Sequence, residues 1–425
     1  MAASCRGGWS DPVSEPKGRI EAPWLRTEDS RRVLAALSAD GKPARFVGGC
    51  VRDALAAPDA DATDLDLATP EPPERVMALL ARAGLPVIPT GLKHGTVTTR
   101  SGRRGFEITT LRRDVACFGR HAEVAFTEDF DEDAARRDFT INAMSCDGEG
   151  RLYDPFGGRY DLAAGRVRFV GAAALRIAED HLRILRFFRF QARFGREPAD
   201  AEALAACKAG AALIDRLSGE RVRQELFRIL MVERVAAALS LMAETGVLAR
   251  IVPWPHAPEP LARLAAFWPE ADPLLRLAAL VRDARPDAES IAAFARRLRL
   301  ANAEAARLER LLTLPLPDPA ASEAERRLAI HHLGEPLYGD LIRLAVALGK
   351  GEAAAAGTAL ALAERWQPPA FPIGGDDLLA RGVPAGPELG RLLQEIRAAW
   401  ERSDFSLDRA ACLRLLDARL HRASA

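Results

Sequence analysis

Hydrophobic and polar positions follow two different patterns along the chain, and the change falls near residue 165. Before it, apolar residues alternate with polar ones in short runs of the kind that form half-buried strands. Segment 101–105, SGRRG, is rich in turn residues and joins the last two runs as a hairpin. Two helical patterns lie between the runs, at 50–57 and 70–84. The predicted strands cover 44–47, 64–68, 94–100 and 105–111.

After residue 165 the apolar positions recur with the 3.6-residue spacing of amphipathic helices. Proline clusters interrupt this pattern and indicate boundaries between helical units. The clearest helices cover 174–195, 221–231 and 233–246, and the proline clusters lie at 252–260, 314–319 and 367–372.

These patterns predict an α+β section followed by an all-helical remainder. The expected division is an N-terminal extension at 1–30, a head at 31–165, a helical neck at 166–235, and a helical body and tail at 236–425.

The composition fits a globular protein with several domains. The chain has 425 residues, of which 48% are hydrophobic and 28% charged, whereas one domain usually contains about 100–200 residues. The 59 basic and 59 acidic residues cancel, so the net charge argues neither for nor against a nucleic-acid partner. Nearly all basic residues are arginine, which fits either a biased base composition or phosphate binding.

The cysteine pattern and the absence of long apolar segments indicate in which cellular compartment the protein is expected. Six scattered cysteines without a CxxC pair favour a reducing compartment over a disulfide framework or a zinc site. The first residues have no apolar stretch typical of a secretory signal. No apolar run reaches the roughly 18 residues that span a bilayer. We therefore expect a cytoplasmic protein without a membrane-spanning helix.

The segment TDLDLAT, residues 63–69, carries two acids one residue apart. Because side chains alternate faces along a strand, Asp64 and Asp66 should share one face while Leu65 and Leu67 enter the core. Two like charges this close repel, and a hard cation such as magnesium would relieve the repulsion. By itself the motif also fits a solvated strand face with two ordinary aspartates.

A third acid strengthens the metal interpretation. Glu107 lies in the strand pattern FEITTL, where Phe106 and Ile108 should point inward and Glu107 outward. If this strand neighbours the first, three carboxylates converge. Such a set can hold two metal ions that activate a hydroxyl and stabilise a leaving oxygen at phosphorus.

The segment RFVGGCVRD, residues 45–53, predicts a strand, a Gly-Gly turn and a helix. Gly48 and Gly49 allow close backbone approach, and the helix N-terminus offers free N–H groups to an anion. Arg52, one turn into the helix, could add a charged contact. A Gly-Gly pair is more often only a turn, but its position shortly before the paired aspartates makes the combination informative.

In their order along the chain, these motifs resemble those of the class II tRNA nucleotidyltransferases, the CCA-adding enzymes, which share a superfamily with bacterial poly(A) polymerases. The resemblance is strongest from about residue 40 to 235. The matching segments are GGCVRD, TDLDLAT, TGLKHGTVTT, FEITTLR, ARRDFTINAM, DPFGGRYDL and AEDHLRILRFFRF. Segment 112–126 occupies the position of the family's flexible loop and has a near-normal length.

The resemblance implies a nucleotidyltransferase-superfamily head with a mixed five-stranded sheet, followed by an all-α neck, body and tail. It implies template-independent addition of CCA to the tRNA 3′ end from CTP and ATP, with release of diphosphate. Asp64 and Asp66 would hold Mg²⁺, and Glu107 would be the third catalytic carboxylate. The residues implied in nucleotide binding are Gly48, Gly49, Arg52, Arg137, Asp138, Asn142, Asp180, Arg183, Arg186 and Arg189.

In this family the aspartate and first arginine of EDxxR pair with the incoming base; here these are Asp180 and Arg183. A carboxylate only accepts hydrogen bonds and a guanidinium only donates them. Cytosine and adenine each present an amino donor beside a ring-nitrogen acceptor, so the pair fits both. Uracil and guanine present the reverse pattern, and each buried mismatch costs about 1–3 kcal/mol.

Three other functions fit parts of this pattern. A bacterial poly(A) polymerase shares the catalytic head, but typically carries a basic segment where this chain has TGLKHGTVTT. A catalytically inactive RNA-binding homologue would not be expected to keep all three acids. A phosphohydrolase activity requires an added His-Asp domain, and the C-terminal histidines at 256, 331, 332 and 421 form no His-Asp pair.

Overall fold

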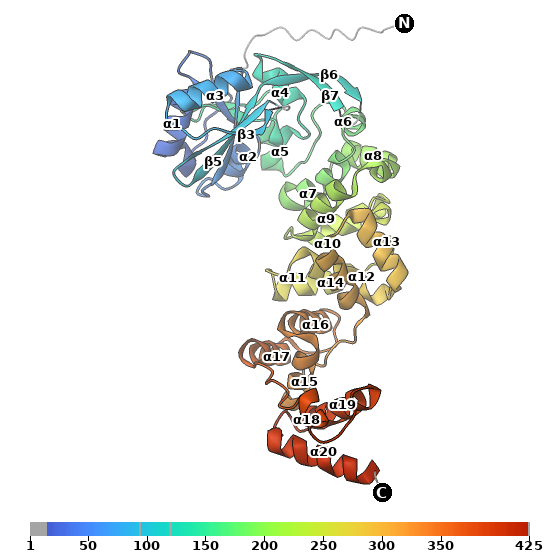
Figure 1. The fold of residues 1–425 in the computed structure, drawn as a ribbon. Coiled ribbons are helices and arrows are strands. Elements are labelled where there is room, and N and C mark those ends of the chain that lie inside the picture. The colour runs from blue at the N-terminus through green and yellow to red at the C-terminus, as the bar shows by residue number, and fades with distance from the viewer. Residues whose placement is uncertain (1–14, 93–94, 119–120, 424–425) are drawn as a thin grey trace. The chain divides into compact units, whose positions relative to one another are not determined.

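The computed structural model describes residues 15–92, 95–118 and 121–423 of the chain (Figure 1). Contacts within the chain divide it into two compact units, Met1–Pro253 and Trp254–Ala425. The first unit contains the α+β head and the helices that follow it. The second unit is helical throughout its described residues. None of the helices described is long and apolar enough to cross a membrane.

A mixed sheet forms the centre of the head. Its strand order is β3-β4-β5-β2-β1-β8-β9, and β2 and β5 are the parallel pair. The predicted hairpin is confirmed, because β4 and β5 pair antiparallel from Thr96↔Thr109 to Ser101↔Arg104. The strands are β1 (Arg45–Val47), β2 (Asp64–Thr69), β3 (Ile88–Gly91), β4 (Thr96–Ser101), β5 (Arg104–Thr110), β8 (Ser145–Cys146) and β9 (Leu152–Tyr153).

The predicted count of five strands is wrong, since the described part of this sheet has seven. The strands β8 and β9 contain two residues each and extend the sheet beyond β1. Two residues are too few to produce an alternating pattern, so the sequence gives no periodic signal for them. Segment 112–126 forms a separate hairpin of β6 (Arg112–Phe118) and β7 (His121–Phe126).

One face of the sheet is covered by α1 (Glu28–Leu37), α2 (Gly49–Ala56) and α3 (Pro73–Arg82). In Figure 1 the ribbons of α1 and α3 lie beside each other over the sheet. Inward residues of β2 and β5, including Leu65 and Phe106, belong to this core. The core also contains Ile20, Trp24 and Leu25, so the head's core begins before residue 31, the predicted start.

The rest of the first unit is helical. It contains η1 (Pro23–Arg26), α4 (Phe130–Ala135), η3 (Thr140–Asn142), α5 (Gly158–Ala164), α6 (Ala173–Glu179), α7 (Arg183–Phe194), α8 (Ala201–Gly210), η4 (Ala211–Arg216), α9 (Gly219–Leu230), α10 (Val235–Glu244) and η5 (Leu248–Arg250). The helix predicted over 174–195 is interrupted: α6 ends at Glu179 and α7 begins at Arg183. Asp180 between them has extended backbone angles, and its carboxylate accepts a hydrogen bond from the Leu182 N–H.

Two hydrophobic cores lie in the C-terminal part of the second unit. One includes side chains of α15, α16 and α17, and the other side chains of α18, α19 and α20. Its helices are α11 (Pro258–Phe267), α12 (Pro273–Val281), η6 (Arg282–Ala284), α13 (Ala288–Leu298), α14 (Asn302–Thr313), α15 (Glu323–Leu333), α16 (Glu335–Ala347), α17 (Ala353–Arg365), α18 (Gly375–Leu379), α19 (Pro387–Arg402) and α20 (Arg409–Ala423). The finer four-part division of the chain stays a prediction.

Candidate active site

Three carboxylates share one face of the sheet in the head. The parallel register of β2 and β5 sets Asp66 opposite Glu107 and Asp64 opposite Gly105. All three acids are exposed, whereas Leu65, Leu67, Phe106 and Ile108 between them are buried. The neighbouring strands inferred from the sequence are therefore present, with the predicted inward and outward residues.

The surroundings of Asp66 disfavour its ionised form. The protein atoms around Asp66 remove water from its carboxylate and raise its pKa above the usual value, and the charge of Glu107 adds to this effect. Arg137 and Arg52 act in the opposite direction. Negative charge is disfavoured at this site, and the three carboxylates offer only oxygen ligands. A hard divalent cation would neutralise the charge and prefers oxygen ligands, so these residues fit such an ion.

A cavity of about 420 Å³ opens beside Asp66. Five arginines and three aspartates line it, together with the glycine turn and one aromatic ring. The lining residues are Gly48, Gly49, Arg52, Asp66, Arg136, Arg137, Asp138, Asn142, Asp180, Arg183, Arg186 and Phe190. Nine of the ten predicted nucleotide-binding residues are in this set. The tenth, Arg189, is one turn beyond Arg186 on α7 and forms an ion pair with Glu225.

The glycine turn is shaped by one unusual backbone conformation. Gly48 precedes α2 with φ 71° and ψ −123°, which residues with a side chain rarely adopt. A Cβ atom at Gly48 would lie 2.8 Å from the Nη1 atom of Arg137. The glycine therefore lets the backbone turn and leaves room for a guanidinium against it.

Asn142 links the two sides of the cavity wall. Its side-chain oxygen accepts a hydrogen bond of 2.5 Å from Arg52, and its amide nitrogen donates one of 2.9 Å to Asp138. The Arg52 guanidinium also lies over the ring of Phe194, 4.4 Å from its centroid. Arg52 and Asn142 are buried, so each has a single arrangement in the wall.

Asp138 connects the head to α7. Its second oxygen accepts hydrogen bonds from Arg186 at 2.6 Å, and its first accepts from the Phe139 N–H at 2.9 Å. Burial alone would raise the pKa of Asp138, but the Arg186 charge and the hydrogen bonds from Asn142 and Phe139 outweigh it and hold the pKa below its usual value. The phenyl rings of Phe139 and Phe190 pack 5.3 Å apart and fix the same junction.

The predicted base-reading residues have other partners here. Asp180 forms an ion pair with Arg221, with contacts of 3.0 and 2.8 Å. Arg183 donates to Glu179 at 2.6 Å and to the Arg136 carbonyl at 2.8 Å. The structure brings Asp180 and Arg183 to one cavity but does not pair them with each other.

Several residues of the site carried no separate signal in the sequence. Asp133 on α4 is buried and accepts from both Arg136 and Arg137. Its spacing of three and four residues before these arginines is typical of helix ion pairs, and that spacing could have indicated it. Arg221 and Glu225 lie on α9, far from their partners in sequence, so only the fold identifies them.

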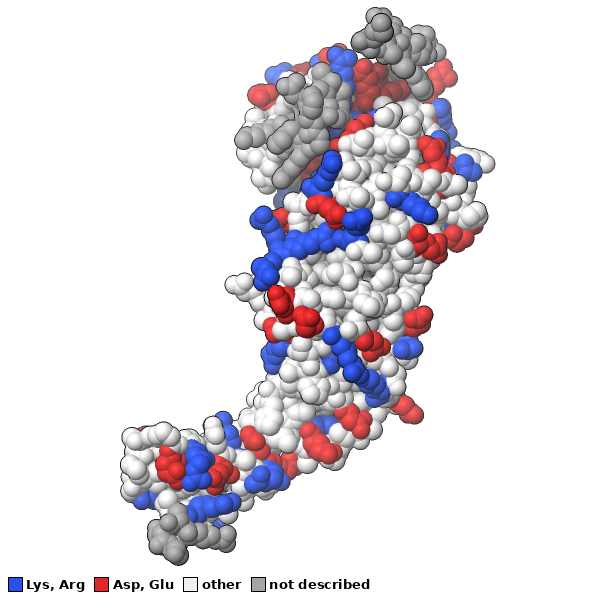
Figure 2. Space-filling view, turned by 90° about the vertical axis from the view of Figure 1, so that its right-hand side faces the viewer, with Lys and Arg blue, Asp and Glu red and all other residues white. Residues whose placement is uncertain are grey.

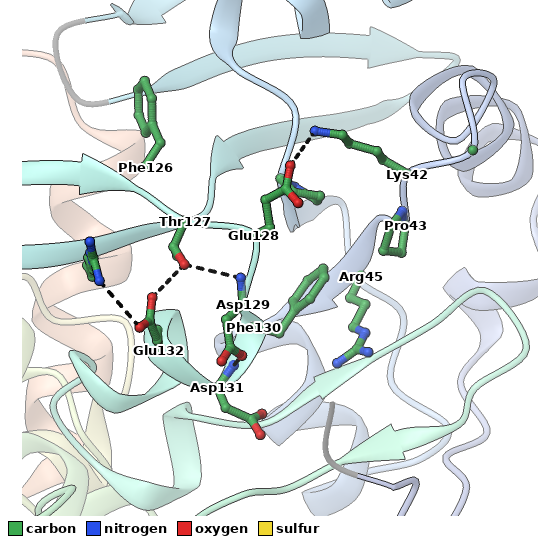
Figure 3. Close-up of a pocket in the computed structure, with 13 residues that line it drawn as sticks. Lys42, Pro43, Arg45, Phe126, Thr127, Glu128, Asp129, Phe130, Asp131 and Glu132 are labelled. Atoms are coloured by element: carbon green, nitrogen blue, oxygen red, sulfur yellow. Dashed lines mark hydrogen bonds and ion pairs between the residues drawn. The ribbon is translucent and has the colours of Figure 1, made fainter. Parts of the chain in front are cut away.

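A larger cavity of about 610 Å³ lies at the base of the β6–β7 hairpin (Figure 3). Two of its basic groups have partners within the protein: Lys42 donates to Glu128 at 2.7 Å, and the Arg45 guanidinium stacks between the rings of Phe130 and Tyr153, 4.1 and 3.5 Å from their centroids. No candidate carboxylate from β2 or β5 lines it. We therefore assign the candidate site to the smaller cavity.

One face of the molecule carries charges of both signs. On the face shown in Figure 2, Lys and Arg side chains lie among Asp and Glu side chains, and several of the basic ones lie side by side. The presence of both signs agrees with the zero net charge of the chain.

Three carboxylates on two paired strands, beside a glycine turn and an arginine-lined cavity, define the chain as a nucleotidyltransferase. Family models match residues 44–168, described as a poly A polymerase head domain, and residues 200–257, described as a probable RNA and SrmB-binding site of polymerase A.

Comparison with known proteins identifies the family. The chain is 37% identical over 390 residues to the mitochondrial CCA tRNA nucleotidyltransferase 1 of Danio rerio, covering 88% of this chain and 86% of that protein. It is 31% identical over 398 residues to the CCA-adding enzyme of Lactobacillus gasseri, covering 90% and 95%. The crystal structure of the Bacillus stearothermophilus CCA-adding enzyme in complex with CTP matches with a TM-score of 0.71 at 26% identity, covering 93% and 98%. The chain belongs to the CCA tRNA nucleotidyltransferase family.

The contact between Asp138 and Arg186 leads to a prediction about stability. Asp138→Asn removes the charge that holds the Arg186 guanidinium, so we expect the free energy of unfolding of the head to fall by about 3 kcal/mol at pH 7. Amide hydrogen exchange in β2 and β5 measures this change. Because the pKa of Asp138 is lowered in the folded state, its stabilisation is complete above the ordinary aspartate pKa of 3.8 and is lost as the pH falls through the folded value.

The difference between wild type and Asp138→Asn should therefore shrink below about pH 4. The exposed Asp59→Asn provides the control and should leave exchange unchanged. A difference that stays constant between pH 7 and pH 3 would contradict the assignment.

Proposed function

We propose that this chain adds the sequence CCA to the 3′ end of tRNA from CTP and ATP, without a nucleic-acid template, and releases diphosphate. The observation that carries the proposal is the placement of Asp64, Asp66 and Glu107 on paired strands beside the arginine-lined cavity. The named relatives support CCA addition over the poly(A) polymerase alternative.

Asp64 and Asp66 would hold magnesium, with Glu107 as the third carboxylate. When bound there, the ions would activate the tRNA terminal hydroxyl and stabilise the leaving oxygen. The oxygen-only donor set and the raised pKa of Asp66 support an ion of this kind. The phosphates of the incoming nucleotide would lie against the glycine turn and α2, where backbone N–H groups and nearby arginines favour anions.

The arginines would bind the nucleotide in two groups. Arg52 and Arg137, near the glycine turn, would face the triphosphate. Arg183 and Asp180, at the start of α7, would face the base, with Arg186 and Arg189 further along the helix. Base binding would exchange the internal partners Glu179 and Arg221 for the base edge.

A cytoplasmic location remains part of the proposal. The vertebrate relatives are described as mitochondrial, whereas other relatives are bacterial proteins.

The first test of the function is nucleotide incorporation into three tRNA substrates, ending at the discriminator base, after the first C, and after CC. We expect CTP to be incorporated into the first two and ATP only into the third, because the base edge of the site has to accept C twice and A once. Gel electrophoresis of the labelled tRNA distinguishes the products. Long adenosine tails formed from ATP alone would favour the poly(A) polymerase alternative.

The second test concerns the carboxylates. Asp64→Ala should lower the incorporation rate by at least about 10³-fold, since metal positioning and charge stabilisation are lost together. Binding of tRNA, measured by filter retention, should change less than threefold. The exposed Asp59→Ala, in the turn that precedes β2, is the matched control and should retain full activity. Unchanged activity in Asp64→Ala would refute the metal assignment.

The third test concerns the glycine turn. Gly48→Ala should raise the KM for CTP about tenfold, because the added Cβ atom would press on the Arg137 guanidinium. Gly41→Ala is the control: Gly41 also has a positive φ, 87°, but its Cβ would meet nothing within 4 Å. Both changes share a backbone cost of about 1–2 kcal/mol. An equal KM in the two variants would exclude a role of the turn in nucleotide binding.

A further inference from the structure

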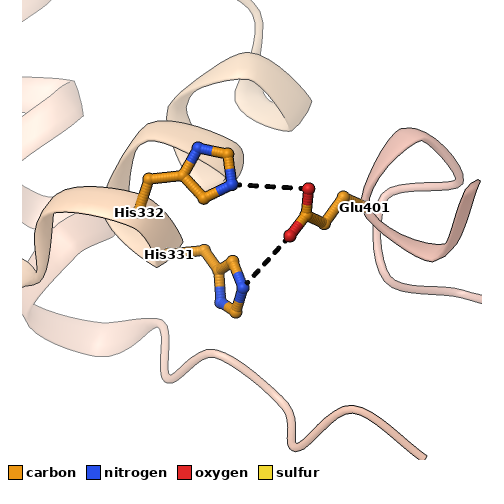
Figure 4. Close-up of side chains that lie close together, drawn as sticks. All are labelled: His331, His332 and Glu401. Atoms are coloured by element: carbon orange, nitrogen blue, oxygen red, sulfur yellow. Dashed lines mark ion pairs between the residues drawn. The ribbon is translucent and has the colours of Figure 1, made fainter. Parts of the chain in front are cut away.

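Two histidines and a glutamate converge in the second unit, away from the carboxylates of the head. His331 and His332 end α15, and Glu401 lies in the last turn of α19 (Figure 4). The Nε2 atom of His331 is 3.6 Å from one oxygen of Glu401, and that of His332 is 3.4 Å from the other. One ligand atom from each of the three residues lies within 4.8 Å of the other two.

We propose that His331, His332 and Glu401 bind a zinc-type divalent transition-metal ion that links α15 to α19. Two imidazole nitrogens and one carboxylate oxygen are a common set of three protein ligands for Zn²⁺, with water in the fourth position. Mg²⁺ and Ca²⁺ prefer oxygen-only sites, so nitrogen ligands favour the transition-metal class.

The distances agree with this coordination. Ligand atoms held about 2.0–2.1 Å from a tetrahedral ion lie roughly 3.3–3.4 Å apart. Each imidazole is close to this value from one oxygen of Glu401, but the two contacts go to different oxygens. One ligand atom from each residue already lies within 4.8 Å of the other two, so the set has to contract around the ion, and His332 can rotate because its side chain is 54% exposed.

The other two ligands are held in position. The His331 ring lies edge-on to Trp400 and Phe405, with centroids 5.8 and 5.1 Å apart, and its side chain is 21% exposed. The Glu401 side chain is 16% exposed. Two ligands fixed by packing and a third open to solvent make a site that an ion can enter without opening the fold.

The surrounding charges also favour a cation. All three ligands lie in the last turns of α15 and α19, where unpaired carbonyl groups give each helix a negative end. Of the nearby basic groups, Arg327 is paired with Asp404, whereas the charge of Arg397 acts against a cation at His331.

The ion would join two separate hydrophobic cores. Ile330, beside the histidines, belongs to the core of α15–α17, and Trp400, beside Glu401, belongs to the core of α18–α20. The contacts across this seam are aromatic and ionic ones such as His331 with Trp400 and Arg327 with Asp404. A metal bridge would therefore raise the stability of this part of the second unit.

The test is equilibrium dialysis of the full chain against Zn²⁺, with millimolar Mg²⁺ present to occupy oxygen-only sites. We expect the wild type to bind one equivalent of Zn²⁺ that His331→Gln and His332→Gln bind at least about tenfold more weakly. His421→Gln, which changes an exposed histidine on α20, is the matched control and should bind as the wild type does. The visible absorption of bound Co²⁺ should show the same dependence.

Two further measurements separate this site from the catalytic carboxylates and from a folding defect. Asp64→Ala should still bind one equivalent of Zn²⁺. The zinc proposal and the catalytic assignment are therefore tested by different results. Zn²⁺ at 100 times its dissociation constant should raise the unfolding midpoint of the wild type by about 5–10 °C, and that of Glu401→Gln by much less. Equal Zn²⁺ affinity in the wild type and in both histidine variants, or no more Zn²⁺ bound by the wild type than by Glu401→Gln, would overturn the proposal.

Discussion

Asp66 and Glu107 face each other across β2 and β5, and the head is organised around this repulsive contact. The opposite face of the same two strands supplies the compensation, since Leu65 and Phe106 are packed in the core with almost no exposure. A shift of one residue in the pairing would turn these apolar side chains to solvent. Hydrophobic burial therefore fixes a register that electrostatics alone would oppose, and it keeps the carboxylates where a cation can neutralise them.

The arginines of the cavity are also like charges that the surrounding structure holds close together. Several guanidinium groups in one small cavity would repel each other and adopt many conformations. Arg137 is held by Asp133, Arg186 by Asp138, and Arg52 by Asn142. Groups that are already oriented need little reorganisation when charge develops during a reaction. This preorganisation is the main source of electrostatic catalysis. The buried acids Asp133, on α4, and Asp138, between α4 and η3, thus serve the site by orienting these arginines.

The sequence predicts the parts of the fold and site that rest on local patterns. The strand around Asp64, the hairpin that carries Glu107 and the helices after residue 165 all follow from periodicity, and the motif order indicates the family. It misses the two-residue strands β8 and β9, because they are too short for a periodic signal and β8 pairs with β1, which is distant in sequence. It also misses the break at Asp180, because the continuous apolar pattern over 174–195 hides a turn that Asp180 stabilises with its own carboxylate.

That turn bears on how the base could be selected. Asp180 is already paired with Arg221, and Arg183 with Glu179. If these two residues read the base, as we propose, binding exchanges one set of ionic hydrogen bonds for another and the net gain is small. A base with the wrong edge would break the internal pairs without replacing them, and each unsatisfied group costs about 1–3 kcal/mol. Selectivity would then come less from attraction to cytosine and adenine than from the penalty on uracil and guanine.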